Sequence, residues 1–442
     1  MGTEFPVASA ERTAGPGRVV DVLIIGAGQA GLGVAYWLRR LGDLQVLVVD
    51  ELLIGQNWLQ RWDSLQLFTP RRFSALPGLR FPAGPTRSPS RVEMAQYLQD
   101  YVRHFSVPVE TGRRVQRLSQ DEFGLVAHTA NGVIRARQVV LATGPFRRPF
   151  VPDAGRGLSS DVRQLHSLQY RRPEDLPPGK VLVVGGGNSA AQLALELQAT
   201  HSVTMASPGP LWFLPEDIAG ISMYWWTLFT GVLQAPADAW ASRYVRRRGD
   251  AIVGTQLRRL VAVGQVRLHP HRVVAGRDRE VELEDGTVLS VSSVLWCTGF
   301  RPDTDWIDVP GAVDGSGAPL HDAGASPVRG LHWMGLPWQT RLNSSNIHGV
   351  GHDARVTARR LPERGRLALE TAVGCGLEVL TQRSATPRPR IAGSARRRCA
   401  PLSCQSFTAD TARFPSRHLW ASCREPGRAS RHARGGWERE AN

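Results

Sequence analysis

The chain contains one strand–glycine–helix unit twice, and this repetition constrains its fold more than any other feature. The first unit has an apolar run at 19–25, a glycine cradle and a helix expected to reach Leu41. The second has an apolar run at 180–184, a similar cradle and another expected helix. The cradle residues are Gly26, Gly28 and Gly31 in the first unit, and Gly185, Gly187, Asn188, Ser189 and Ala190 in the second.

The spacing within both cradles matches what binding a dinucleotide requires. In such a motif the first glycine allows a tight turn, the second lets the backbone approach a pyrophosphate, and the third small residue lets helix and strand pack closely. The phosphate then lies at the positive end of the helix. Because each cradle stands between an apolar strand and a helix, the sequence predicts two dinucleotide sites rather than two ordinary glycine turns.

The residue that ends the strand after each cradle indicates which dinucleotide is bound. A strand at 45–50 follows the first cradle and ends in Asp50, with Glu51 next to it, where ribose hydroxyls need an acceptor. The corresponding strand of the second unit, at 203–206, is followed by Ser207. A carboxylate there would favour NAD and repel a 2′-phosphate, so its absence favours NADP, although no arginine stands at this position either.

Two further apolar strands, at 138–142 and 293–297, each end in Thr-Gly and are expected to mark crossings between two dinucleotide domains. The residues concerned are Thr143, Gly144, Thr298 and Gly299, which are also expected to contact the cofactors. One crossing precedes the second cradle and the other follows its domain, so the second domain is predicted to be inserted in the first. The fold class is therefore α/β, with two Rossmann-like dinucleotide-binding domains. Alternating polarity predicts a small antiparallel meander over 266–291.

Charge and cysteine content restrict the classes of function that this chain can have. The net charge is +15, but 13 arginines against 5 acidic residues lie in the segment 374–442, and the only lysine is Lys180. This segment has few large aliphatic residues, so it is expected to be a disordered arginine-rich tail or, alternatively, a basic interaction segment. The five cysteines include no CxxC pair, which argues against a dithiol relay and against a metal site.

The N-terminal region lacks the pattern of a signal peptide, so a cytoplasmic protein is expected. The most apolar run, 218–235, carries Gly, Ser, Thr and Gln and is expected to be a helix beside a substrate or cofactor cavity rather than a membrane span. Trp225, Trp226 and Trp338 are expected to line the substrate pocket.

Four further segments, together with the cradles, resemble the flavin-containing monooxygenases, in particular a bacterial branch of NADPH-dependent flavoproteins. These segments are IGQNWLQRWDSLQLFTPRRFSALPGLRFP (54–82), QLHSLQY (164–170), CTGFRPD (297–303) and GLPWQTRLNSSNIHGVGHDA (335–354). The resemblance implies FAD held in the first cradle and NADPH visiting the second, so that hydride passes between them. The expected order is a disordered N-terminus (1–17), a first FAD segment (18–150), an NADPH domain (151–290), a second FAD segment (291–373) and the tail.

The resemblance also implies catalytic candidates. The family fingerprint FxGxxxHSxxY is present as His166, Ser167 and Tyr170, whereas its Phe and Gly are replaced. The replacing residues are Ser160 and Val162. Without the family, His166 would more often be a hydrogen-bonded structural histidine. The asparagine that eukaryotic members place near the reactive flavin carbon aligns at Phe68 or Thr69, and Thr69 is taken as the candidate.

Other residues are implied to contact the flavin. Trp58 and Trp62 would be plain packing residues on their own, and the resemblance makes them flavin-side contacts. A helix is expected to begin after Gly351 and to continue towards Val373, with its positive N-terminus facing the flavin. Gly351 and Asp353 are therefore cofactor candidates.

The function that the resemblance implies is an FAD-dependent, NADPH-using monooxygenase. NADPH would reduce the flavin, O₂ would add to it as a hydroperoxide, and a nitrogen or sulfur nucleophile or a 2-oxo acid would take one oxygen atom. The altered fingerprint leaves an alternative open, an NADPH oxidase or reductase that oxygenates nothing. Specific nucleic-acid binding lacks a basic helix or aromatic platform. The expected partners are a small-molecule substrate and O₂, and a homodimer is left open.

Overall fold

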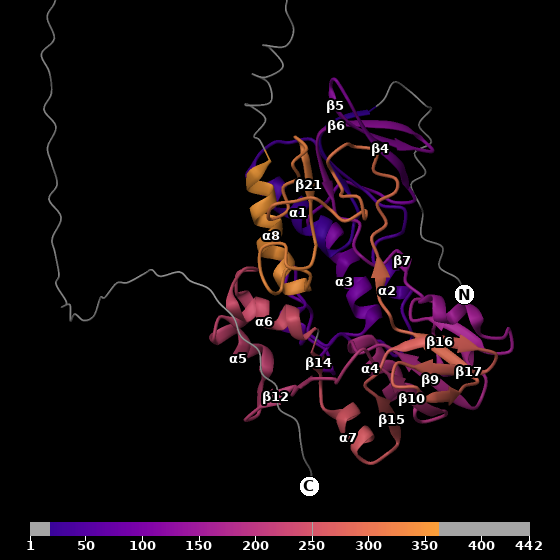
Figure 1. The fold of residues 1–442 in the computed structure, drawn as a ribbon. Coiled ribbons are helices and arrows are strands. Elements are labelled where there is room, and N and C mark those ends of the chain that lie inside the picture. The colour runs from indigo at the N-terminus through magenta and orange to yellow at the C-terminus, as the bar shows by residue number, and fades with distance from the viewer. Residues whose placement is uncertain (1–17, 250, 362–442) are drawn as a thin grey trace, which may run out of the picture. The chain divides into compact units, whose positions relative to one another are not determined.

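The structure, a computed structural model, describes residues 18–249 and 251–361, which all belong to one compact unit of the chain (Figure 1). The disorder predicted for 1–17 and for the tail at 374–442 falls outside the described residues. Within them, no helix is long and apolar enough to cross a membrane. Two sheets, one mixed and one parallel, organise the described chain, and each has its own cradle.

The first sheet holds the first cradle. Its strands are β1 (Arg18–Ile25), β2 (Val46–Val49), β3 (Val109–Glu110), β4 (Val115–Asp121), β5 (Gly124–Thr129), β6 (Gly132–Leu141) and β21 (Leu331–Trp333). Their order is β3-β2-β1-β6-β5-β4, and β21 pairs with β6 in parallel. β1 is apolar on both sides because helices cover one face and the segment 306–313 covers the other.

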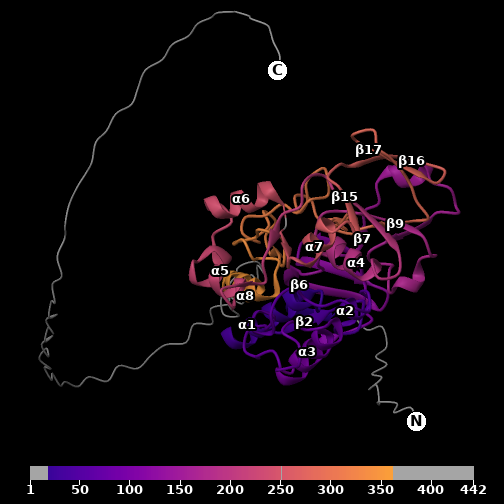
Figure 2. The same ribbon diagram turned by 90° about the horizontal axis from the view of Figure 1, so that it is seen from below.

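Three helices cover one face of this sheet, and two of them pack against each other. They are α1 (Gln29–Leu41), α3 (Arg91–His104) and α8 (Ile347–Arg360). Figures 1 and 2 both show α8 alongside α1. The close approach depends on Gly33 of α1, where an added Cβ would lie 3.3 Å from both Val350 and Ala354 of α8.

The second sheet holds the second cradle and is parallel throughout. Its strands are β8 (Arg163–His166), β9 (Lys180–Val184), β10 (Ser202–Ala206), β15 (Val266–His269) and β19 (Ser293–Trp296), in the order β15-β10-β9-β19-β8. The helices α4 (Asn188–Leu197) and α7 (Gln256–Ala262) cover one face. On the other face lies an antiparallel meander of β16 (Val273–Arg277), β17 (Glu280–Leu283) and β18 (Val288–Ser290).

The connections between the sheets show an insertion. After β6 the chain leaves the first sheet through β7 (Arg148–Pro149), builds the second sheet, and returns through β20 (Phe300–Arg301). β7 and β20 pair with each other in antiparallel fashion, so the two crossings lie side by side. Then β21 rejoins β6. The predicted fold class, with one dinucleotide domain inserted in another, is confirmed.

Two predicted boundaries need correction. The strand β19 was placed in the second FAD segment (291–373), but it pairs with β9 and β8 inside the second sheet. The return to the first sheet therefore follows β20. The meander was predicted over 266–291, but its first part is β15, which pairs in parallel with β10.

Short elements complete the described chain. They are α2 (Gln56–Leu59), α5 (Met223–Phe229), α6 (Trp240–Arg248), β11 (Phe213–Leu214), β12 (Asp217–Ile218), β13 (Ile221–Ser222) and β14 (Ile252–Val253). The apolar run 218–235 begins in the β12–β13 hairpin, continues as the short helix α5 and then forms a 3-10 helix at Val232–Gln234. Phe73, from the first domain, packs in one buried cluster with Met223 and Tyr224 of α5.

Candidate functional site

In the first cradle, each of the three positions requires glycine for a different steric reason. Gly26 has φ +109°, and an added Cβ would lie 2.3 Å from the carbonyl oxygen of Ala142. At Gly31 an added Cβ would lie 1.9 Å from the carbonyl oxygen of Gly26. At Gly28 an added Cβ would meet no heavy atom of the described residues within 4 Å. Open space therefore lies at the N-terminus of α1, where a pyrophosphate would bind.

Asp50 follows β2 and points back at this cradle. Its Oδ2 accepts a hydrogen bond from the Ala27 amide at 2.7 Å, and its Oδ1 accepts one from the Leu52 amide at 2.8 Å. Burial raises the pKa of the carboxyl, and the two amide hydrogen bonds oppose that shift. Glu51 is turned away and pairs with Arg147 at 2.6 Å. Of the two candidate acids, only Asp50 contacts the cradle.

The second cradle repeats this arrangement. Gly185 has φ +142°, and an added Cβ would lie 2.4 Å from the carbonyl oxygen of Cys297. At Gly187 an added Cβ would again meet nothing within 4 Å among the described residues. Ala190 is fully buried against the sheet, as the third position requires. Ser189 is exposed in the first turn of α4.

Asn188 has a structural task that the sequence did not reveal. Its Nδ2 donates to the carbonyl oxygen of Ala251 at 2.8 Å, and its Oδ1 accepts from the Val253 amide at 3.0 Å. The side chain therefore holds β14 against the start of α4.

Ser207 directly follows β10, the strand after the second cradle, as predicted. Its hydroxyl donates a hydrogen bond to the carbonyl oxygen of Gly209 at 2.5 Å.

The two Thr-Gly strand ends each support one cradle. The β6 end, before Thr143, contacts Gly26, and the β19 end, before Thr298, contacts Gly185. Gly144 and Gly299 both have positive φ, at +71° and +81°. The Thr298 hydroxyl donates to the carbonyl oxygen of Phe150 on the other crossing. The 293–297 strand thus supports the second cradle and not the first.

The helix α8 begins earlier than predicted, at Ile347 instead of after Gly351. Its glycines serve close packing: an added Cβ at Gly351 would lie 2.8 Å from Pro77. Asp353 lies in the second turn, is fully buried, and accepts a hydrogen bond from the Thr340 hydroxyl. Burial raises the pKa of its carboxyl.

Two buried acceptors beside this helix lack partners. Asp353 Oδ2 and Asn343 Oδ1 have no hydrogen-bond partner among the described residues. Asn343 lies over the helix, where an added Cβ at Gly349 would lie 2.9 Å from its amide carbon. Buried acceptors without donors are costly, so they point to a group outside the protein chain that donates hydrogen bonds here.

His166 ends β8 and is 1% exposed. Its Nδ1 accepts a hydrogen bond from the Leu168 amide at 3.2 Å, which makes Nε2 the donor to the carbonyl oxygen of Gly299 at 3.0 Å. Burial lowers the pKa of the imidazole. Both ring nitrogens are therefore used inside the protein, and the structure favours the structural role over the catalytic one.

The other fingerprint residues are also internal. Tyr170 is fully buried, and its hydroxyl donates to Glu196 Oε2 of α4 at 3.0 Å. Burial and the Glu196 charge raise the pKa of the phenol. Ser167 is 4% exposed, and its amide donates to the carbonyl oxygen of Trp296. The fingerprint thus binds β8 to β19 and α4, and the structure brings none of its side chains to an open site.

Thr69 is buried as well, and its hydroxyl lies 2.8 Å from that of Ser74. Its neighbour Phe68, the other aligned position, lines a cavity. Trp58 is half-buried and packs against the helix-covered hydrophobic cores of both sheets. Trp62 is 4% exposed, and its Nε1 has no hydrogen-bond partner among the described residues.

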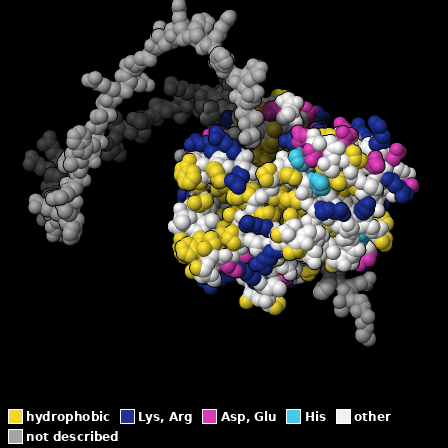
Figure 3. Space-filling model, turned by 60° about the horizontal axis from the view of Figure 1, so that its bottom comes forward, with side chains coloured by type: hydrophobic (Ala, Val, Ile, Leu, Met, Phe, Trp, Pro, Cys, Tyr) yellow, Lys and Arg dark blue, Asp and Glu magenta, His cyan; other side chains and the backbone are white. Residues whose placement is uncertain are grey.

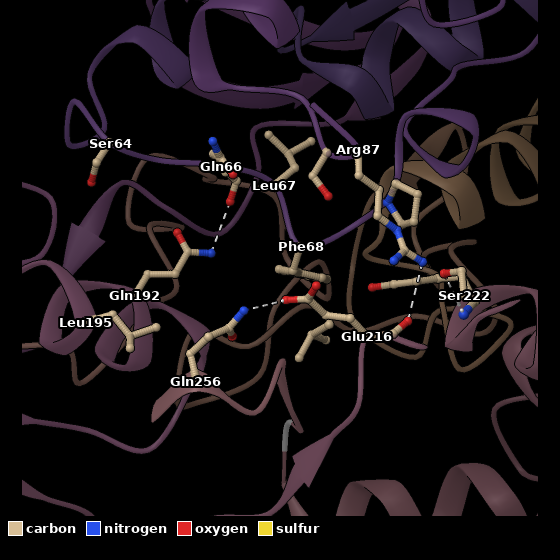
Figure 4. A pocket seen from close by; sticks show the side chains of 14 residues that line it. Ser64, Gln66, Leu67, Phe68, Arg87, Gln192, Leu195, Glu216, Ser222 and Gln256 are labelled. Carbon is tan, nitrogen blue, oxygen red and sulfur yellow. Dashed lines mark hydrogen bonds between the residues drawn. The ribbon is translucent and has the colours of Figure 1, made fainter. Parts of the chain in front are cut away.

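The cavity, of about 320 Å³, is lined by residues of both dinucleotide domains (Figure 4). From the first domain come Ser64, Gln66, Leu67, Phe68, Pro70, Arg87 and Ser88, and from the second come Gln192, Leu195, Glu216, Ser222, Tyr224, Val253 and Gln256. Gln192 of α4 donates to the carbonyl oxygen of Gln66 at 3.0 Å. Arg87 pairs with Asp217 at 2.5 Å, and Gln256 donates to Glu216 at 3.2 Å. Apart from Gln66, which lies in the segment 54–82, these polar residues belong to none of the motifs in the sequence, and only the fold brings them together.

The tryptophans expected at the pocket do not line this cavity. Trp225 packs edge-on against Phe73, and Trp226 is 39% exposed. Arg246 of α6 lies over Trp338, at 4.8 Å from the ring centroid. Figure 3 shows one face of the molecule, on which hydrophobic side chains are interspersed with Lys and Arg.

Comparisons with known proteins agree with this geometry. The family model of the pyridine nucleotide-disulphide oxidoreductases matches residues 23–224. The CzcO-like oxidoreductase of Geobacillus kaustophilus is 39% identical over 337 residues, which are 76% of this chain and 97% of that relative. A probable indole-3-pyruvate monooxygenase of Arabidopsis thaliana is 30% identical over 208 residues, which are 46% of this chain and 50% of that relative.

A solved structure extends the comparison to the whole fold. A flavin-containing monooxygenase from Stenotrophomonas maltophilia matches with a TM-score of 0.66 and 28% identity, over 78% of this chain and 98% of that one. The described residues contain a single cysteine, Cys297, so they hold no dithiol pair of the kind that a disulfide reductase uses. The chain belongs to the family of the CzcO-like oxidoreductases, and its sequence and fold are similar to those of the flavin-containing monooxygenases.

Proposed function

We propose that this flavin-dependent monooxygenase binds FAD in the first cradle and NADPH in the second, and transfers one oxygen atom of O₂ to a substrate in the cavity between the domains. FAD, when bound, accepts a hydride from NADPH and activates O₂. The observation that carries the proposal is the cavity itself, because its walls come from both dinucleotide domains.

The residues of the first domain fit FAD. The open space at Gly28 takes the pyrophosphate, and Asp50 keeps free lone pairs for ribose hydroxyls. The unpartnered acceptors Asn343 Oδ1 and Asp353 Oδ2 suit the hydroxyl and N–H donors of a flavin and its ribityl chain. The start of α8 at Ile347 adds a positive helix end at this place.

The residues of the second domain fit NADPH. Gly187 leaves the N-terminus of α4 open for a pyrophosphate. The strand β10 is followed by Ser207, so no carboxylate at this position repels a 2′-phosphate. The first feature suits either nicotinamide dinucleotide, and the second supports NADPH over NADH as the reductant.

The lining of the cavity supports a small substrate with both apolar and polar parts. Leu67, Phe68 and Tyr224 supply apolar walls that exclude water. Arg87 borders the cavity and already pairs with Asp217 through one nitrogen, and its remaining N–H groups can donate to a carboxylate, which supports the 2-oxo acid among the candidate substrates. Amines and thioethers use the apolar walls alone.

The buried fingerprint favours one alternative function. Because His166 and Tyr170 are engaged inside the protein, they cannot protect an activated oxygen species, and an NADPH oxidase that releases peroxide fits the same fold. Oxygen-18 gas separates the two functions. With amines, thioethers and 2-oxo acids as substrates, the monooxygenase incorporates one labelled atom into a product. Recovery of all NADPH electrons as hydrogen peroxide with every substrate would favour the oxidase.

A further inference from the structure

Arg61 lies over two aromatic rings at the crossings between the domains. Its guanidinium carbon is 4.7 Å from the ring centroid of Phe146 and 5.6 Å from that of Phe300. Phe146 belongs to the outgoing crossing and Phe300 to the returning one, and the two rings meet edge to face at 5.2 Å. The side chain of Arg61 is therefore held in a fixed plane by both crossings.

The charge of Arg61 is not neutralised. Among the described residues, its guanidinium makes neither a hydrogen bond nor an ion pair, and the charged group that most affects it is another arginine, Arg171. Burial, with a contribution from the Arg171 charge, lowers the pKa of Arg61 to about 10. Arg147, in the same outgoing crossing, is by contrast paired with both Glu51 and Asp303. A half-buried cation without a partner is costly unless an anion joins it.

Arg61 lies at the same edge of the second sheet as the second cradle. The Phe300 ring contacts the ring of His166, at 4.9 Å, and His166 ends β8. Arg61 is therefore at the carboxyl edge of the second sheet, on the β19 and β8 side of the cradle strand β9. In a sheet of this type the adenosine half of the dinucleotide lies over the opposite side, towards β10. The nicotinamide half must then extend towards Arg61.

We propose that Arg61 binds the nicotinamide-side phosphate of NADPH. The proposal rests on the proposed use of NADPH and assigns a residue that belongs to neither cradle. The planar guanidinium donates two parallel hydrogen bonds to phosphate oxygens, and the rings of Phe146 and Phe300 fix its plane beforehand. Arg61 is thus a cofactor-binding residue outside the cradle, and its contact with the phosphate sets where the nicotinamide lies.

The test measures the equilibrium binding of NADP⁺ to the FAD-loaded protein by isothermal titration calorimetry. In Arg61→Gln, the Kd for NADP⁺ should rise about 10- to 100-fold, as expected for loss of a charge-assisted bidentate contact. Adenosine 2′,5′-bisphosphate lacks the nicotinamide-side phosphate, so its Kd should stay the same. Arg61→Lys keeps the charge without the fork and should give an intermediate Kd.

Arg148→Gln is the matched control. Arg148 lies in the same crossing but pairs with Asp305 at 3.2 Å and is largely exposed, so its loss should leave both Kd values unchanged. The ratio of flavin to protein absorbance checks that each variant is folded. An unchanged Kd for NADP⁺ in Arg61→Gln would overturn the proposal, and so would an equal loss for both ligands, which would place Arg61 at the adenosine half. If the unsubstituted protein binds no NADP⁺, the proposed function itself fails.

Discussion

Substituting alanine for Gly28 separates cofactor binding from folding. In the structure, Gly28 has φ −77° and ψ −173°, which alanine adopts without strain, and its Cβ would meet no described atom within 4 Å. The protein without FAD should therefore be as stable as before. It should even gain about 0.4–1 kcal/mol, because alanine restricts the unfolded chain more than glycine does.

The same methyl should remove most of the affinity for FAD. It projects into the space at the N-terminus of α1 where the pyrophosphate must approach the backbone. Losing two charge-assisted hydrogen bonds of about 1.5–3 kcal/mol each would cost about 3–6 kcal/mol. At 1.4 kcal/mol per factor of ten, the Kd for FAD should rise by about 10²- to 10⁴-fold.

Gly31→Ala provides the contrast within the same cradle. An added Cβ there would lie 1.9 Å from the carbonyl oxygen of Gly26, so the helix must move away from the strand. Overpacking of this kind costs about 1–3 kcal/mol or more. Urea unfolding of the FAD-free proteins gives the stabilities, and quenching of flavin fluorescence gives the Kd for FAD. A Gly28→Ala protein that unfolds early, or that binds FAD with unchanged affinity, would refute the reasoning.

Three further predictions concern other parts of the chain. Gly187→Ala should leave FAD content unchanged but weaken NADP⁺ binding in calorimetry, because its Cβ also enters open space; loss of FAD instead would mean that the cradles are reversed. Burial lowers the pKa of His332 to about 4. Its neutral form thus contributes stability above pH 6.5 that is lost as the pH falls towards 4, up to about 3 kcal/mol, and urea unfolding of His332→Gln should show a shallower pH dependence. Ending the chain after Val373 should leave the thermal midpoint and flavin content nearly unchanged, since the described core ends at Leu361; precipitation or loss of FAD would contradict this.

The sequence predicted the cradles well because their signals are local. In each one, a strand, three small residues and a helix follow one another directly, and Asp50 comes at the end of the next strand. The steric conditions at Gly26 and Gly31 arise within the same turn or from the strand beside it. Short-range patterns of this kind leave few alternative conformations.

Features that depend on distant partners were missed. The sequence of β19 is apolar and would fit a buried strand in either sheet. Only its pairing with β8 and β9 shows that it belongs to the second sheet. The helix was expected to begin only after Gly351, whereas α8 begins at Ile347 and its glycines at 349 and 351 let Asn343 and Pro77 approach it. The family fingerprint implied a catalytic role for His166, and the structural role expected from the residue alone could not be assigned to a partner, because its acceptor, the carbonyl of Gly299, lies 133 residues away in sequence.

The central claim is that one cradle holds a flavin which the ligand of the other cradle reduces. The most direct measurement is the visible spectrum of the purified protein under anaerobic conditions, before and after addition of NADPH. The account predicts a flavin band that corresponds to about one equivalent of FAD per chain and that NADPH bleaches faster than NADH does. In the Arg61→Gln and Gly187→Ala variants, limiting NADPH should bleach this band more slowly than in the unsubstituted protein. A protein without a flavin band after incubation with FAD, or one whose band persists with both nicotinamides, would contradict it.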